Sequence, residues 1–218
     1  MKNVWLYIVG FIIGAGILFG YAQFKAQKSQ PIPASHKQTP SSTFSVETPP
    51  SESLQGTIAS RAGTLFWESR IATVPSELKE NVPIQQGEQL ITEEKSTATV
   101  KFDTASTITL SENSDISFIQ TLPVDFVVGQ IKGTIKYVMD GTTPLSIRVR
   151  NALITKTSGI IQITVTDADP IILISTLQGT AQIGFNDLDY VSQVFTLREG
   201  QVYEYNSDEH TAINTKNK

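Results

Sequence analysis

The sequence predicts an all-β fold: a single β-rich domain of sandwich, roll or solenoid-like type after one N-terminal transmembrane helix. Three observations support this prediction. An uncharged apolar run lies near the N-terminus, a stretch rich in proline, serine and threonine follows it, and apolar residues recur at every second position from Leu54 onward. The predicted parts are a membrane anchor with its flanks at 1–28, a disordered linker at 29–53, a β domain at 54–206 and a polar C-terminal tail at 207–218.

The first element is Val4–Ala22, a run of 19 residues without a charge. As an α-helix it would extend about 28 Å, close to the ~30 Å hydrocarbon core of a bilayer. Trp5 and Tyr21 lie near its two ends, where aromatic rings favour the membrane interfaces. The lipid bilayer is therefore the predicted partner of this segment.

Glycines in the predicted helix form two small-x3-small pairs, at Gly10 with Gly14 and at Gly16 with Gly20. Such pairs let two helices approach closely, which suggests a homodimer through the membrane. The alternative is the ordinary use of glycine in transmembrane helices, and we favour that alternative.

Processing and orientation of this segment each have two interpretations. Small residues at Gly20 and Ala22 would allow signal peptidase to cut after Ala22, but the apolar stretch is longer than in most cleaved signals, so we predict an uncleaved signal-anchor. More lysines follow the helix than precede it, which mildly favours a cytoplasmic C-terminal side.

The linker at 29–53 contains 15 Pro, Ser or Thr among its 25 residues. Such a composition cannot build an apolar core. A flexible coil of this length would reach roughly 25–30 Å. We expect it to hold a folded module away from the bilayer.

The β domain is predicted from alternation of apolar and polar residues, because successive side chains of a strand point to opposite faces. A short helical turn is expected only at Pro75–Asn81, and the continuous apolar run Ile171–Ile174 is expected to be covered on both faces. The residues predicted to face the core include Ala98, Val100, Phe102, Ile108, Leu110, Ile116, Phe118, Ile131, Ile135, Tyr137, Met139, Leu145, Ile147, Val149, Ile161, Ile163, Val165, Ala181, Ile183 and Phe185.

Spaced glycines recur among the alternating apolar residues of the predicted β domain. They are Gly56, Gly63, Gly87, Gly179 and Gly200, in the segments GTIASRAGTLFW, VPIQQGEQLITEEKSTATVKFDTASTITL, ISTLQGTAQI and LREGQVYEY. In the order of these segments, roughly 54–206 resembles the FecR domain, an extracytoplasmic β-rich module of bacterial envelope proteins.

The FecR resemblance implies a β domain outside the cytoplasm and a cytoplasmic N-terminus, and we follow it over the lysine count. Family members that regulate sigma factors carry a cytoplasmic domain before the membrane helix. Here Met1–Asn3 precede the predicted helix, so binding to a sigma factor is not expected from the resemblance.

The composition argues against several classes of function. The net charge is −4, which gives no electrostatic reason to expect nucleic acid as a partner. Cysteine is absent, the two histidines are His36 in the linker and His210 near the C-terminus, and no catalytic motif is found. Two Asp-x-Asp pairs, at 167–169 and 187–189, are expected to stabilise turns rather than to bind calcium. We therefore predict no enzyme activity, no cofactor and no metal.

One cluster of basic residues is a candidate binding site. If 139–145 closes a hairpin, Lys136 would face Arg148 across it and Thr134 would face Arg150. Lys132 would continue this polar face, and Lys156 would extend it. Like charges placed opposite each other destabilise a sheet, so either nearby carboxylates neutralise them or they contact an anionic ligand.

The predicted function is a membrane-anchored, extracytoplasmic binding or scaffold module that presents its β domain to the cell envelope. Its predicted partners are an anionic envelope polymer or another envelope protein. The alternative is a transmembrane signalling or regulatory protein that acts through dimerisation of the helix.

Overall fold

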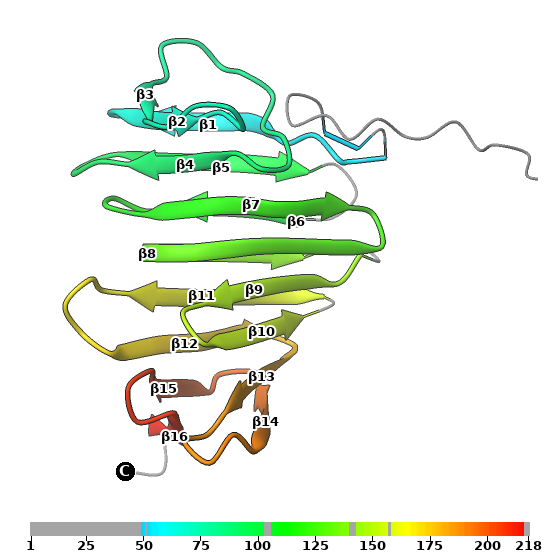
Figure 1. Cartoon of the computed structure of the whole chain (residues 1–218), viewed down its shortest axis with the longest axis vertical. Helices are drawn as coiled ribbons and strands as arrows, with labels where there is room; N and C mark the ends of the chain where they lie inside the picture. The colour runs from blue at the N-terminus through cyan, green and yellow to red at the C-terminus, as the bar shows by residue number, and fades with distance from the viewer. Residues whose placement is uncertain (1–48, 51, 103–105, 140–142, 157, 216–218) are drawn as a thin grey trace, which may run out of the picture. The chain divides into compact units, whose positions relative to one another are not determined.

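The computed structural model describes residues 49–215 except 51, 103–105, 140–142 and 157 (Figure 1). Nearly all regular structure in these residues is β-strand, which confirms the predicted all-β class. The predicted helix at Val4–Ala22, its four glycines and the linker up to residue 48 lie outside the described residues. Within the described part of the chain, no helix has the length and apolar character needed to cross a bilayer.

The strands form two sheets that pack face to face, and all neighbouring strands are antiparallel except β8 and β9. Sheet I contains, in spatial order, β1 (Thr57–Ala62), β5 (Thr97–Phe102), β6 (Ser106–Leu110), β8 (Asp125–Met139), β11 (Gly159–Val165), β12 (Ile171–Gln178), β15 (Val202–Asn206) and β16 (Thr211–Asn214). Sheet II contains β3 (Ser76–Glu77), β2 (Leu65–Glu68), β4 (Gln89–Thr92), β7 (Asp115–Leu122), β8, β9 (Leu145–Val149), β10 (Ala152–Lys156), β13 (Thr180–Asn186) and β14 (Ser192–Arg198).

Strand β8 belongs to both sheets. Its first half pairs with β7 and β9 in sheet II, and from Gly133 onward it pairs with β11 and then β6 in sheet I. Gly133 has φ 86°, a conformation that glycine adopts without strain. The buried Gln130 stabilises the crossing, because its Nε2 donates to Gly133 O at 2.9 Å and to Ile163 O at 3.0 Å, and its Oε1 accepts from Tyr137 Oη at 3.0 Å.

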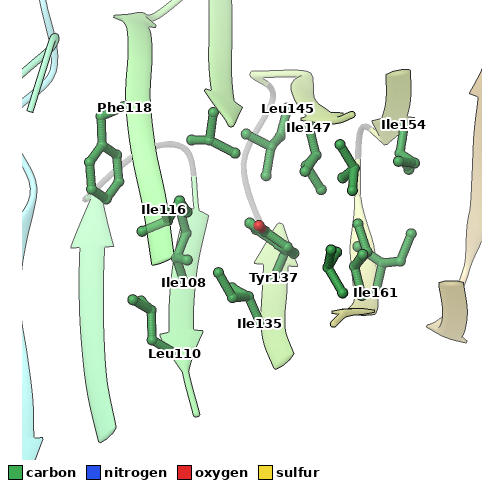
Figure 2. Packing of buried hydrophobic residues seen from close by; sticks show 14 of the residues in the cluster. Ile108, Leu110, Ile116, Phe118, Ile135, Tyr137, Leu145, Ile147, Ile154 and Ile161 are labelled. Carbon is green, nitrogen blue, oxygen red and sulfur yellow. The ribbon is translucent and has the colours of Figure 1, made fainter. Parts of the chain in front are cut away.

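The core lies between the sheets and is built from the inward residue of each alternating pair (Figure 2). Aromatic contacts join the layers: the ring centroids of Phe102 in sheet I and Phe118 in sheet II are 5.5 Å apart. Tyr205 in sheet I and Phe185 in sheet II are 4.8 Å apart. One apolar core of this kind stabilises both sheets together.

Four details differ from the sequence predictions. Ile131 is 49% exposed, because the register of β8 against β7 shifts just before Gly133 and changes the alternation. In the run Ile171–Ile174 only one face is covered, and Leu173 is 39% exposed. The expected helical turn is instead the short strand β3, and the expected polar tail contains β16.

Candidate functional site

The predicted hairpin between β8 and β9 is wrong, and the basic cluster is therefore divided. Strand β9 runs parallel to the first half of β8, in sheet II, whereas Lys136 lies on the second half, in sheet I. Lys136 is opposite Thr109 and Gln162, and Arg148 is opposite Gly129 and Leu153. The cause is the crossing of β8 at Gly133, which places the two basic residues on different sheets.

Lys132 and Arg150 are held by groups of the domain itself. The Nζ of Lys132 is 3.7 Å from Asp167 Oδ2, and Lys132 is also opposite Asp115 in the strand register. The guanidinium of Arg150 donates at 2.8 Å to Ser207 Oγ and to two loop carbonyls, Thr166 O and Asp169 O. These two cations therefore connect loops to the sheets.

Lys156 does not extend a polar face, because its side chain is buried at 2% exposure. Its Nζ donates to Gln178 O at 2.7 Å and to Thr180 O at 3.0 Å, the carbonyls on either side of a turn. Burial lowers the pKa of Lys156, and the carboxylate of Glu199 opposes that shift. This lysine fixes the turn between β12 and β13.

The outer surface of sheet I carries a set of side chains that we call the threonine face. It consists of the outward residues of β5, β6, β8 and β11, which alternate with buried core residues. Its members are Thr97, Thr99, Lys101, Thr107, Thr109, Thr134, Lys136, Val138, Ile160, Gln162 and Thr164.

The hydroxyls of the threonine face form cross-strand contacts. Thr99 Oγ1 and Thr109 Oγ1 are 3.4 Å apart, and Thr134 Oγ1 and Thr164 Oγ1 are 3.0 Å apart. A hydroxyl keeps further donor or acceptor capacity after one such bond, so these groups can also bind a ligand. The sheet holds them in regular rows about 4.8 Å apart.

The charge of the threonine face is positive. Its two ionisable members, Lys101 and Lys136, are exposed, and none of its members is a carboxylate. In the described part of the chain, neither of these two lysines forms an ion pair within 4.0 Å. In a chain of net charge −4, this surface is therefore a patch of local positive charge.

Arg148 lies on the outer surface of sheet II, beside a shallow hollow of about 440 Å³. Leu153, Gly184 and Val194 continue the same row across β10, β13 and β14. Leu153 is 41% and Val194 is 66% exposed, so this row is apolar except for Arg148. Arg150 also lines the hollow, but its guanidinium is already bonded to Ser207 Oγ and two loop carbonyls.

The described residues contain no group of three or more His, Cys, Asp or Glu that could hold a metal ion. His210, the histidine in the described range, has its Nδ1 2.7 Å from the carbonyl oxygen of Asn186. Two buried carboxyls have separate partners. Burial raises the pKa of Glu88, whose Oε2 accepts from Gln85 N at 2.8 Å. Burial also raises the pKa of Asp115, whose Oδ1 accepts from Gln89 Nε2 at 2.7 Å. These contacts stabilise local structure.

No family model matches this chain, and no curated protein matches it. Among solved structures, it is similar to two crystal structures of a candidate anti-sigma factor from Parabacteroides distasonis, with a TM-score of 0.49 and identities of 12% and 11%. Each match covers 58% of this chain and 58% of the other chain, so this chain spans little more than half of the structures it matches. The likeness carries no argument about function.

Sequence reasoning placed Lys136 on an outward polar face but missed Lys101 and the threonines beside it. The signal was present in the strand TATVKF, where Thr97, Thr99 and Lys101 alternate with core residues. The pattern does not show which strands lie beside this one in the sheet. The order β5, β6, β8 brings residues 97–101 and 134–138 to one surface.

Proposed function

We propose that this protein is a single-pass, membrane-anchored binding module of FecR-like type, whose β domain works outside the cytoplasm. In this proposal the threonine face binds a phosphate-bearing polymer of the cell envelope. The uncharged segment Val4–Ala22 and the linker after it support the anchor, and the order of glycines and strands supports the FecR-like character.

The observation that carries the proposal is the chemistry of the threonine face. Hydroxyl groups donate hydrogen bonds to phosphate oxygens, and the ammonium groups of Lys101 and Lys136 supply the opposite charge. A phosphodiester polymer offers both repeated anionic groups and hydroxyls, which match the mixed donors and acceptors of this surface.

The separation of the two lysines favours a polymer over a single phosphate. Lys136 is displaced from Lys101 by two strands across the sheet and by two residues along β8. With strands about 4.8 Å apart and about 3.4 Å per residue, their Cα atoms are about 12 Å apart. Two anionic groups of an extended chain would be bound at once.

The test replaces both lysines, as Lys101→Gln with Lys136→Gln, in the full-length detergent-extracted protein. We expect weaker retention on immobilised inorganic polyphosphate, and the slope of log affinity against log salt should fall by about 1–2, because fewer counterions are displaced. The matched control is Lys79→Gln with Lys95→Gln, which removes the same charge from exposed positions elsewhere.

A second arm uses vesicles with and without an anionic phospholipid, which distinguishes a polymer from lipid headgroups as the source of phosphate. Retention on polyphosphate that is equal for the wild type, the double variant and the control would contradict the proposed role of the threonine face. Binding to the anionic vesicles without binding to polyphosphate would contradict a polymer as the ligand.

A further inference from the structure

The N-terminal edges of the two sheets are protected against pairing with another strand. Strand β1 has a register shift between Ile58 and Ser60, and the guanidinium of Arg61 donates to the carbonyls of Leu78 and Lys79 in the following loop. The corresponding edge strand of sheet II, β3, is only two residues long. Bulges, covering loops and very short strands are the usual means of protecting a sheet edge.

Strand β14, at the opposite edge of sheet II, lacks these protections (Figure 1). It has seven residues, pairs with β13 along its whole length without a register shift, and contains no proline. Its only charged residue is Arg198, at its end. Among the described strands β13 is its only pairing partner. At its end, Arg198 N donates to Gln201 Oε1 and Arg198 O accepts from Gln201 N, so the other backbone edge is open from Ser192 to Thr196.

Apolar side chains surround this open edge. Val194 is 66% exposed on the outer face, and the β13–β14 turn exposes Leu188, Tyr190 and Val191 at 65%, 88% and 56%. On the inner face, Phe195 is only half-buried although it stacks on the buried Phe185 at 5.8 Å. The core therefore ends at this edge without a covering layer.

We propose that β14 pairs antiparallel with β14 of a second copy, about a two-fold axis at Phe195, so that sheet II continues from one copy into the other. This inference does not depend on the ligand of the threonine face. In this register Phe195 lies opposite its own counterpart and Val194 lies opposite Thr196.

The charges of β14 fit a second copy. Like charges in directly opposite positions would oppose pairing of two strands. With Phe195 on the axis, Arg198 lies opposite Ser192 of the other copy, so no like charges face each other. The inner face of each copy also brings one half-buried phenylalanine to the other, which completes the core that each copy leaves open. A two-fold interface requires self-complementarity of this kind.

The test uses disulfide formation between full-length copies in their membrane. Because the chain has no cysteine, every disulfide must come from an introduced residue. We would tag Val194→Cys and Thr196→Cys variants differently, co-express them and oxidise the membranes. Directly opposite residues have Cβ atoms about 4.5–5.5 Å apart, so we expect the mixed disulfide to exceed either homodimer.

Ser60→Cys, on the protected edge β1, is the matched control and should give no dimer. A chain that carries both Val194→Cys and Thr196→Lys should form no disulfide with the Thr196→Cys chain. The circular dichroism of this double variant should stay that of a β protein. An excess of either homodimer would overturn the axis at Phe195. Absence of any disulfide above the control, or a disulfide to a different protein, would overturn the pairing of two copies.

Discussion

At the scale of single residues, the buried Lys156 shows what the alternation of apolar and polar residues predicts and what it leaves out. Ala152, Ile154 and Lys156 have the same parity in β10, so the pattern itself places the lysine inside. The chemical type of the side chain suggested the opposite, because lysine is rarely buried without partners. Its two carbonyl partners come from residues 178 and 180, which no local pattern connects to it.

Asp115 provides a prediction about pH. Burial raises the pKa of Asp115 above its ordinary value of 3.8, so the folded state holds this proton at pH values where the unfolded state has lost it. The free energy of unfolding should therefore fall as pH rises from about 4 through the raised pKa of the folded state. Asp115→Asn should remove this part of the pH dependence, as measured by urea unfolding between pH 3 and pH 8.

The matched control is Asp125→Asn, since Asp125 is exposed and also accepts a glutamine amide, from Gln120 at 2.9 Å. At neutral pH we expect Asp115→Asn to be at least as stable as the wild type, because the amide oxygen can still accept from Gln89 and the buried charge is gone. If the unfolding curves of wild type and Asp115→Asn shift in parallel with pH, the Asp115 carboxyl is not the cause of the pH dependence of stability.

Among the elements, β8 was the hardest to predict. Its alternation correctly identified Ile135, Tyr137 and Met139 as core residues, because each half of the strand keeps a period of two. The sequence did not predict that β8 passes from sheet II to sheet I at Gly133, because the alternation does not show which strands are neighbours. A parallel partner, β9, follows β8 directly in the chain, and local turn signals favoured an antiparallel hairpin.

Gly133→Ala should destabilise the domain by about 2–4 kcal/mol, because a Cβ there would lie 2.3 Å from the Cα of Ser114 and φ is 86°. Gly184→Ala is the control in another strand, where the nearest atoms to a new Cβ are 3.9 Å away, and it should change stability by less than about 1 kcal/mol. Denaturant unfolding measures both. Equal stability of the two variants would contradict the role of Gly133 at the crossing.

For the whole molecule, the sequence predicted the class of fold from the long alternating segments and only part of the candidate site. Lys136 was recognised, but Lys101 was not, because the two come together only through the order of strands in sheet I. The placement of the domain relative to a membrane depends on residues outside the described range and remains a prediction from the sequence.

The placement is tested with protease on intact cells and on inverted membrane vesicles. We expect the protease to cut the linker and release the β domain from intact cells, and the domain to stay protected in inverted vesicles, because the FecR resemblance implies an extracytoplasmic location. The lysine count around the predicted helix implies the reverse pattern. A β domain found in the supernatant of detergent-free membranes without protease would contradict the anchor itself.

The crossing of β8 also affects how the chain can fold during its synthesis. The described strands made before residue 125 form two groups, in the orders β1–β5–β6 and β3–β2–β4–β7. An isolated backbone bridge between Gly56 and Ile84 connects the segments that flank them. Residues 125–139 pair with members of both groups and also with β9 and β11, which the ribosome makes later. Among the described strands, this one segment therefore pairs with both earlier groups, and it also provides the edges on which the later strands β9 and β11 assemble.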